Sequence, residues 1–300
     1  MKDIKFRKPQ KTDFELLDTY FRKYPTRCCD RTATNLILWS SNYHVLFAEY
    51  KGTILFKEEM ANGYAFPVGS DENVREVLTE LIEESRKNQE EFYIYEVTKE
   101  MQEKIDVWFP MQFETEYERN SYDYVYEVES LATLKGKKLH AKRNHINKFM
   151  KMNEGEWSYE VMSEENLEEC LNMAAKWCEQ NGCHEDEQKA HEICVTKHAI
   201  LSREELGMTG GVLKLRGEVI AFTIGKSVNE DTFVTHIEKA YADVDGAYAM
   251  INQQFAKQEL LGKYMYVNRE EDLGKEGLRK AKLSYRPAFL IEKGVSSLIL

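Results

Sequence analysis

The chain has 300 residues, 42% of them hydrophobic and 12% aromatic, and a formal net charge of −11 at pH 7. This length can bury one large or two medium cores, and it favours two domains. The net negative charge argues against a protein that binds nucleic acid nonspecifically over its whole surface, so any contact with RNA or lipid head groups is expected to be local. The start MKDIKFRKPQ lacks the apolar run of a signal peptide, and no segment resembles a membrane span. We therefore expect a soluble, cytosolic protein.

The first half of the chain predicts the order helix, hairpin, helix, strand, helix, strand. Thr12 or Asp13 can cap a helix that ends near Lys23, because Tyr24-Pro25 follows. Residues 44–56, HVLFAEYKGTILF, form two β-rich runs around a Lys-Gly pair, which is a hairpin signal. The later elements are a helix behind Ser70 or Asp71 with apolar residues at Val74, Val77, Leu78, Leu81 and Ile82, a strand at 92–97, a helix at 100–107 and a strand at 122–128.

A basic stretch, residues 135–151, follows this first half. Its sequence KGKKLHAKRNHINKFMK holds seven Lys/Arg and no Asp/Glu, so the other 283 residues carry a formal charge of −18. As a helix it presents Lys138, Lys142 and His145 on one face and Leu139, Ile146 and Met150 on the inner face. Such a cationic island can meet a polyanion, although a solvated linker helix is the alternative.

After the basic stretch the same order of elements returns. We expect a strand at 157–162, a helix opened by Ser163 with Glu164 and Glu165 and ended at Asn181-Gly182, a helical insertion at 187–205, a hairpin at 212–224 that turns at Arg216-Gly217, a strand at 232–241, a helix at 247–255, a strand at 264–267, a helix at 275–283 and a closing strand at 289–291. Two copies of one α/β unit explain the repetition better than one continuous sheet, so we predict domains at residues 1–134 and 135–300.

The six cysteines fit a reducing compartment better than a disulfide framework. A group that could be considered for zinc consists of Cys170, Cys178, Cys183 and Cys194 with His184, His191 and His198. No paired C-x-x-C occurs there, and Cys170 and Cys178 share the apolar side of the predicted helix. We expect buried or loop thiols and no metal site.

The order of antiparallel strands before a strand-helix crossover resembles the GNAT acyltransferase fold. The resemblance implies an α/β (α+β) protein of two tandem GNAT-like domains, each with a mixed, mostly antiparallel sheet flanked by helices. That fold holds the pyrophosphate of acetyl-CoA on a Gln/Arg-x-x-Gly-x-Gly/Ala loop at a helix N-terminus. The matching loop here is DVDGAY, residues 243–248, where Asp243 replaces the Gln or Arg, Asp245 adds a second charge and Tyr248 fills a small-residue position. Two carboxylates would repel a pyrophosphate by about 1 kcal/mol each if exposed, so acetyl-CoA is disfavoured and no other cofactor is expected.

The C-terminal runs YVNREEDLG, residues 266–274, and GLRKAKLSYRP, residues 277–287, resemble another group. A G-L-R-x-x-K-x-x-[FY]-x-P run occurs at the matching place in the C-terminal catalytic domain of phosphatidylglycerol lysyltransferases. The chain more distantly resembles the Fem-type peptidoglycan aminoacyltransferases, which share a tandem GNAT build. RNHINKF at 143–149 and HIEKA at 236–240 also resemble family segments, so the resemblance covers nearly the whole chain. No counterpart of the membrane-embedded flippase half occurs in these 300 residues, which leaves a lipid acceptor open.

The resemblance implies transfer of an aminoacyl group from aminoacyl-tRNA to a hydroxyl or amine acceptor, with an anionic lipid as one candidate. Cationic groups at fixed places lower the barrier, because attack on the ester forms an oxyanion and expels a ribose oxygen near phosphates. The expected catalytic residues are Lys282, Arg279, His236 and Glu238. The expected substrate-binding residues are Asn268, Glu270, Asp272, Tyr285 and Lys239, and those expected on tRNA phosphates are Lys138, Lys142, Arg143 and His145. We expect Lys142, Arg143, Arg279 and Lys282 to converge on one cleft.

Several alternatives stay open at this point. His236 could equally be a hydrogen-bonded core histidine, and Glu270 and Asp272 could be a solvated turn or a helix cap. A CoA-dependent N-acyltransferase with an altered loop and a non-catalytic RNA- or partner-binding relative are the other two functions that this fold allows.

Overall fold

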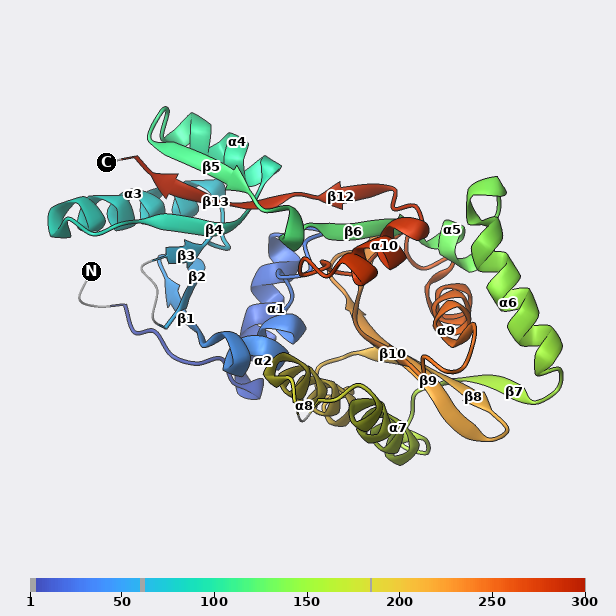
Figure 1. The fold of residues 1–300 in the computed structure, drawn as a ribbon. Coiled ribbons are helices and arrows are strands. Elements are labelled where there is room, and N and C mark those ends of the chain that lie inside the picture. The colour runs from blue at the N-terminus through green and yellow to red at the C-terminus, as the bar shows by residue number, and fades with distance from the viewer. Residues whose placement is uncertain (1–3, 60–62, 184, 300) are drawn as a thin grey trace. The chain divides into compact units, whose positions relative to one another are not determined.

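The computed structural model describes residues 4–59, 63–183 and 185–299, which form two compact units (Figure 1). The first unit holds the chain up to Asp123 together with Glu271–Lys275 and the segment that begins at Leu290. The second unit holds Tyr124–Glu270 and Glu276–Phe289. The units do not follow the expected division between residues 134 and 135, because the chain returns to the first unit near its C-terminal end.

The first unit is built on a six-stranded sheet of order β1-β2-β3-β4-β13-β5 (Figure 1). Its strands are β1 (Val45–Tyr50), β2 (Thr53–Glu58), β3 (Gly63–Ala65), β4 (Tyr93–Thr98), β5 (Phe113–Tyr117) and β13 (Lys293–Leu298). Its helices are α1 (Phe14–Lys23), α2 (Ala33–Tyr43), α3 (Asp71–Asn88) and α4 (Lys99–Trp108), with single turns η1 (Lys11–Asp13) and η2 (Arg119–Ser121).

The sequence predicted most of this unit. The hairpin of β1 and β2 is confirmed, and so is α3, which begins behind Ser70 and buries the five apolar residues expected of it. The short strands β3 and β5, the helix α2 and the strand β13 were not predicted. In β13 the Gly-Val-Ser-Ser run carries little β signal beyond Val295.

The second unit is built on a seven-stranded sheet of order β12-β6-β11-β10-β9-β8-β7 (Figure 1). Its strands are β6 (Asp123–Glu127), β7 (Trp157–Val161), β8 (Thr209–Leu215), β9 (Glu218–Ser227), β10 (Thr232–Ala240), β11 (Tyr266–Asn268) and β12 (Phe289–Ile291). Its helices are α5 (Val128–Thr133), α6 (His140–Met152), α7 (Leu167–Gln180), α8 (Glu187–Leu201), α9 (Ala247–Phe255) and α10 (Glu276–Ser284), with a 3-10 turn η3 (Lys137–Leu139) and a π-helical turn η4 (Ala256–Leu260).

Three details of the helices differ from the sequence-based expectation. Lys138 lies in the 3-10 turn before α6, so it does not share the helical face of Lys142. Met150 is 42% exposed, and Phe149, three residues after the buried Ile146, is buried in its place. The helix α7 begins at Leu167 behind Asn166, whose Oδ1 accepts a hydrogen bond from the amide of Ser163.

The two sheets share one arrangement. In each, one pair of neighbouring strands runs parallel, β3 with β4 and β10 with β11, and a helix, α3 or α9, connects the two strands of the pair. The hairpins β1-β2 and β8-β9 are antiparallel. The predicted α/β class with two mixed sheets flanked by helices is therefore confirmed.

The helices of both units are short or polar. Within residues 4–59, 63–183 and 185–299, none is long and apolar enough to cross a membrane.

Candidate active site

In the second unit, the strand β10 and the turn after β11 bring a histidine and a carboxylate together. A β-bulge between Thr235 and Ile237 interrupts the pairing of β10 with β9 and aims His236 out of the regular ladder. The Nδ1 atom of His236 lies 2.9 Å from Oε1 of Glu270. The His236 side chain is fully buried, whereas that of Glu270 is 18% exposed, so the carboxylate is the member that solvent can reach.

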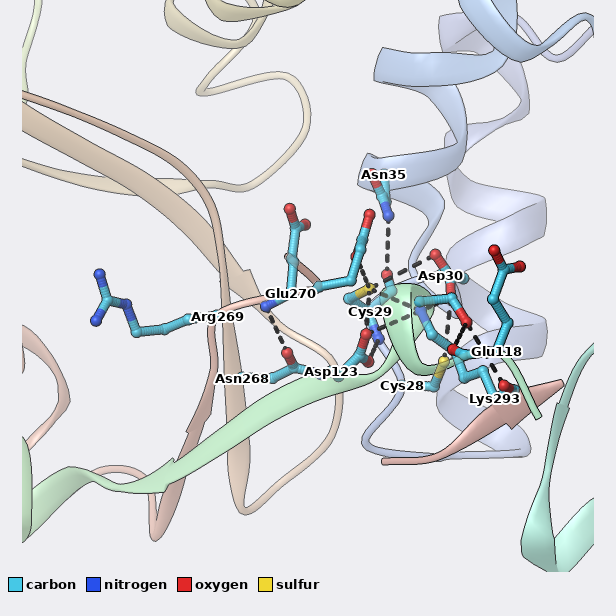
Figure 2. Close-up of polar contacts among 12 residues, drawn as sticks. Cys28, Cys29, Asp30, Asn35, Glu118, Asp123, Asn268, Arg269, Glu270 and Lys293 are labelled. Atoms are coloured by element: carbon cyan, nitrogen blue, oxygen red, sulfur yellow. Dashed lines mark hydrogen bonds and ion pairs between the residues drawn. The ribbon is translucent and has the colours of Figure 1, made fainter. Parts of the chain in front are cut away.

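The turn that carries Glu270 is held in an unusual conformation. Glu270 has φ 58°, in the left-handed region that non-glycine residues avoid. Its amide donates to Oδ1 of the fully buried Asn268 at 2.8 Å (Figure 2). The ammonium of Lys282, on α10, donates to the carbonyl oxygens of Arg269 at 2.6 Å and Glu270 at 3.1 Å. Strain of this kind persists where neighbours enforce it, and it concentrates at functional sites.

Arg269 points a buried guanidinium at Glu238. Its Nη2 donates to Oε1 of Glu238 at 2.7 Å, and Nδ2 of Asn252, on α9, donates to the other carboxylate oxygen at 3.5 Å. Burial lowers the pKa of Arg269, but the charge and hydrogen bond of Glu238 together with Tyr126 and Tyr285 raise that pKa above its usual value. The guanidinium also lies 5.2 Å from the ring centre of Tyr285.

Lys142 reaches the same ring from the basic helix α6. Its ammonium lies 4.0 Å from the ring centre of Tyr285, a cation–π contact. Burial, and then the charge of Arg269, lower the pKa of Lys142. Burial raises the pKa of Tyr285 to about 12, so its hydroxyl stays a donor at neutral pH. We call Lys142, Glu238, Asn252, Arg269 and Tyr285 the Arg269 cluster.

The Arg269 cluster leaves polar atoms without partners. In the part of the chain that the structure describes, the buried atoms Nη1 of Arg269 and Oδ1 of Asn252 have no hydrogen-bond partner. Lys142 forms no ion pair with any described carboxylate, so Glu238 alone faces two cations there. Unsatisfied buried polar atoms and surplus buried charge cost free energy, and a ligand of matching chemistry would recover it.

The other residues predicted for the site lie in several different places. Arg279 lies half-buried on α10, one turn before Lys282. Lys239 is 4% exposed and is paired with Glu192 and stacked 3.9 Å from the ring centre of Trp177. Asp272 belongs to the first unit, where it accepts from Arg119 at 3.3 Å and from the amide of Gly274 at 2.9 Å.

The residues predicted to bind tRNA do not lie together in one place either. Of these, Lys142 alone joins the Arg269 cluster, and Lys138 is exposed before α6. Arg143 donates to the carbonyl oxygens of Leu134 and, at 2.7 Å, Gly136, which end and follow α5. His145 Nδ1 lies 3.3 Å from Oδ1 of Asp245.

Sequence reasoning missed Arg269 and Asn252. Arg269 stands between two predicted site residues in the run YVNREEDLG, so the only signal was its place in a segment already singled out. Asn252 lies on the apolar helix α9 and is 6% exposed, and a buried Asn within an apolar helical pattern was the signal available for it.

The first unit holds a second buried ionic group, which we call the Lys293 cluster, made of Cys29, Asp30, Asp123 and Lys293 (Figure 2). The Lys293 ammonium lies 2.6 Å from Asp30 Oδ2 and 2.8 Å from Asp123 Oδ1, and 3.7 Å from Cys29 Sγ. The ligand atoms of Cys29, Asp30 and Asp123 are close enough together to hold a metal ion. Because the ammonium already contacts all three, Lys293 is the cation of this site.

The cysteine and histidine group considered for zinc is not assembled in the described residues. Cys170, Cys178 and Cys183 are buried and Cys194 is exposed, and their ligand atoms do not gather in threes with the described histidines. His184 lies outside the residues that the structure describes. Burial raises the pKa of Cys183 to about 11, which keeps it a thiol.

Comparison with known proteins gives the family. A sequence model described as the C-terminal region of phosphatidylglycerol lysyltransferase matches residues 21–293. A conserved protein of unknown function from Bacteroides thetaiotaomicron is 38% identical, with a TM-score of 0.90 over 99% of this chain and 100% of that one. The C-terminal domain of a putative lysylphosphatidylglycerol synthetase from Agrobacterium fabrum is 13% identical, with a TM-score of 0.63 over 96% and 92% of the two chains.

An uncharacterised curated relative from Mycoplasmoides gallisepticum is 24% identical over 62% of this chain and 59% of its own length. The chain thus spans less than two thirds of that relative. The structural match to the Agrobacterium fabrum domain, at 13% identity, shows a shared fold. The chain belongs to the phosphatidylglycerol lysyltransferase C-terminal family.

Proposed function

We propose that this protein moves an aminoacyl group from aminoacyl-tRNA to a hydroxyl or amine acceptor. The observation that carries the proposal is the contact between His236 on β10 and Glu270, 2.9 Å apart. Glu270 lies in a turn that Lys282 holds through two carbonyl oxygens. A carboxylate oriented by a buried histidine, with fixed positive charge beside it, is suited to proton transfer at an ester.

In the proposed reaction, the acceptor oxygen or nitrogen attacks the ester carbonyl carbon of the aminoacyl group. Glu270, the more exposed member of the pair, takes the proton of the nucleophile, and His236 positions the carboxylate. The bond from the carbonyl carbon to the ribose oxygen then breaks, and the proton passes to that oxygen. Lys282 and Arg279 supply positive charge near the developing oxyanion, and Lys282 also fixes the strained turn.

The donor is proposed to be aminoacyl-tRNA and not acetyl-CoA. The amino end of α9, where the GNAT pyrophosphate loop would lie, is covered by α6. A Cβ added at Gly246 would lie 3.0 Å from the carbonyl oxygen of His145, and Asp245 is bound by Lys148 at 2.6 Å. A pyrophosphate at this end would have to displace α6 and separate that ion pair. A CoA thioester that raises the melting temperature of the protein would contradict this part of the proposal.

The test is transfer of label from mixed radiolabelled aminoacyl-tRNAs to the fractions of a cell extract. The Lys282→Ala variant should label roughly a hundredfold more slowly than the parent while staying folded by circular dichroism. The matched control is Lys148→Gln, which removes an exposed lysine of the same chain that is paired with Asp245, and it should label at the parental rate. Equal rates for Lys282→Ala and the parent would remove Lys282 from the mechanism.

The roles of His236 and Glu270 can be distinguished by the pH dependence of the transfer rate. If Glu270 takes the proton, Glu270→Gln should lose transfer at every pH. His236→Asn, which keeps one hydrogen-bond donor near Glu270, should keep partial activity but shift the acidic limb of the pH profile. An unchanged profile in His236→Asn would assign the histidine to packing alone.

A further inference from the structure

We infer that the first unit holds a second ligand site, in which Arg31 and Glu96 bind a small molecule that carries one carboxylate. Both residues belong to the first unit, outside the Arg269 cluster. The inference does not depend on the transfer reaction, because it follows from a buried cation to which the described residues supply no anion.

Arg31 is a buried cation without an ion-pair partner in the part of the chain that the structure describes. The residue is 4% exposed, and it directly precedes Thr32, which caps α2. Its guanidinium makes one side-chain contact within the described ranges, a weak one from Nη2 to the thioether sulfur of Met101 at 3.8 Å. Its Nε is buried and has no hydrogen-bond partner among those residues. Arginine is almost never fully buried unless it is paired, so an anion from outside would supply what is lacking.

Glu96 is a neighbour of this guanidinium. Arg31 contacts Met101 in the first turn of α4, and α4 directly follows β4, the strand that carries Glu96. Burial raises the pKa of Glu96 to about 8 and the charge of Asp30 adds to this effect, whereas the charge of Arg31 opposes it. The carboxyl of Glu96 is therefore neutral at pH 7, and it can donate as well as accept a hydrogen bond.

The backbone holds Glu96 in an unusual conformation. Its φ of 56° lies in the left-handed region. The pairing of β4 with β13 shifts at this point, because Ile94 faces Ser296 whereas Val97 faces Gly294. A bulge of this kind re-aims a side chain, and such strain concentrates at functional sites. The Glu96 side chain is half-buried and has no hydrogen-bond partner within residues 4–59, 63–183 and 185–299, so its carboxyl is available to a ligand.

The second unit has a glutamate in a similar place. Glu96 directly follows Tyr95, the last residue of β4 that pairs with the parallel strand β3. Glu270 lies two positions after Asn268, the last residue of β11 that pairs with the parallel strand β10. Both glutamates have a left-handed φ, and Glu270 belongs to the candidate active site. This correspondence favours a ligand site at Glu96 over a local irregularity of packing.

The charges around Arg31 favour a ligand with a single negative charge. Lys293 is already paired with Asp30 and Asp123, so those acids do not neutralise Arg31. One carboxylate balances the guanidinium, whereas a phosphate dianion would leave a net negative charge beside Asp30. A planar carboxylate also matches the fork of a guanidinium, and the neutral carboxyl of Glu96 can donate to one of its oxygens.

The test is isothermal titration calorimetry of the full chain with acetate, butyrate and inorganic phosphate as probes. At least one of the two carboxylates should bind with a dissociation constant of about 1 mM or less, and about tenfold more tightly than phosphate. Failure of both carboxylates to bind at that concentration would overturn the inference. Phosphate binding as tight as that of the better carboxylate would overturn the selectivity for a monoanion.

Arg31→Met tests the anchor of the site. It should abolish carboxylate binding, and it should raise the midpoint of urea unfolding, because it removes a buried cation without a partner. Arg22→Gln is the matched control and should bind as the parent does, since Arg22 is exposed on α1 and paired with Asp18. Equal losses of binding in the two variants would show a general charge effect and overturn the site. A marked fall in the unfolding midpoint of Arg31→Met would show that the protein itself stabilises the guanidinium, which would also overturn it.

The part of Glu96 is tested by proton uptake. An anion beside its carboxyl should raise its pKa further, so binding at pH 8 should take up part of a proton, which calorimetry in two buffers of different ionisation enthalpy measures. The other charged groups that act on Glu96 are Asp30, Arg31, Lys293 and Asp123. Glu96→Gln keeps a hydrogen-bond donor, so it should retain binding within about threefold and lose the proton uptake. Uptake that persists unchanged in Glu96→Gln would remove Glu96 from the site.

Discussion

In the first unit, the ammonium of Lys293 lies among two carboxylates and a thiol, all within contact distance, and the amide of Glu118 donates to its carbonyl oxygen at 3.0 Å (Figure 2). In the second unit, Arg269 has one carboxylate partner and an Nη1 atom with no partner among the described residues. Both cations are buried and both are paired with acids. The two clusters differ in whether every buried polar atom has a partner within the protein. Buried polar networks that only stabilise the fold are satisfied internally, whereas those that bind a ligand keep some donors and acceptors for the ligand.

The two clusters also differ in how their surroundings shift the pKa of the cation. Burial alone lowers the pKa of Lys293, but Asp123 and Asp30 outweigh it and raise that pKa well above the usual value. Burial raises the pKa of Cys29 well above its usual value, so this thiol is not a nucleophile at neutral pH. In the Arg269 cluster, by contrast, the pKa of Lys142 is lowered, as expected for a cation whose anion is not supplied by the protein.

The largest effect should come from breaking the Lys293 cluster. Lys293→Met keeps the side-chain volume but leaves Asp30 and Asp123 as buried charges without a cation. Loss of one partner from a buried ion pair typically costs about 3–5 kcal/mol, so we expect a fall of that size in the free energy of unfolding, measured by urea titration.

The control for that variant restores neutrality. A triple variant, Lys293→Met with Asp30→Asn and Asp123→Asn, should recover much of the lost stability, because no buried charge is left uncompensated. A loss of less than about 1 kcal/mol in Lys293→Met alone, within the range of an exposed ion pair, would show that water reaches this cluster.

In the Arg269 cluster, we expect a substitution to raise the free energy of unfolding. Asn252→Leu replaces a buried amide, one atom of which lacks a partner, by an apolar side chain of similar volume. Removing an unsatisfied buried polar group should raise the free energy of unfolding by about 1–2 kcal/mol while reducing transfer. The measurement is the same urea titration, run beside the transfer assay.

A matched variant sharpens this contrast. Asn268→Leu, at an Asn that is fully buried, removes the hydrogen bond to the amide of Glu270 and should destabilise the protein. If both Asn variants lower stability by similar amounts, the amide of Asn252 is satisfied in solution and the distinction between the two clusters fails.

The sequence predicted elements well where periodicity was strong and the site poorly where contacts join distant segments. The helix α3 and both hairpins follow from spacing and turn residues that lie close together in the chain. The Arg269 cluster joins α6, β10, α9 and the segments after β11 and α10, and no local pattern reports which of these meet. The return of β13 to the first sheet is likewise a long-range pairing, and its residues have no strong local preference for a strand.

The role predicted for His236 and Glu238 illustrates the same limit. Regular alternation along β10 indicated that they share one face, and their partners, Glu270 and Arg269, are in fact consecutive residues. Alternation could not predict the bulge between Thr235 and Ile237, or the strained turn at Glu270. Their catalytic roles stay predictions for the transfer assay.

The smallest expected effect is a change in the pH dependence of stability, and it comes from Glu96 beside the Lys293 cluster. Burial, and then the charge of Asp30, raise the pKa of Glu96 on β4 from 4.5 to about 8. The folded protein therefore holds a proton on Glu96 that the unfolded chain loses near pH 4.5, so this group favours folding at low pH. Its contribution is lost as pH rises through the interval from about 4.5 to 8.

Glu96→Gln should therefore flatten the decline of unfolding free energy between pH 5 and 8, by less than about 1 kcal/mol per pH unit because the side chain is half-buried. Urea titrations across this interval measure the slope, and Glu100→Gln, an exposed acid in the first turn of the next helix, is the control. In the Arg269 cluster, Glu238 is paired with a guanidinium, so Glu238→Gln should not change the slope in this direction. If Glu238→Gln flattened the slope as much as Glu96→Gln, the stability of both clusters would depend on pH in the same way. The pairing of their buried polar atoms would then not distinguish the two clusters.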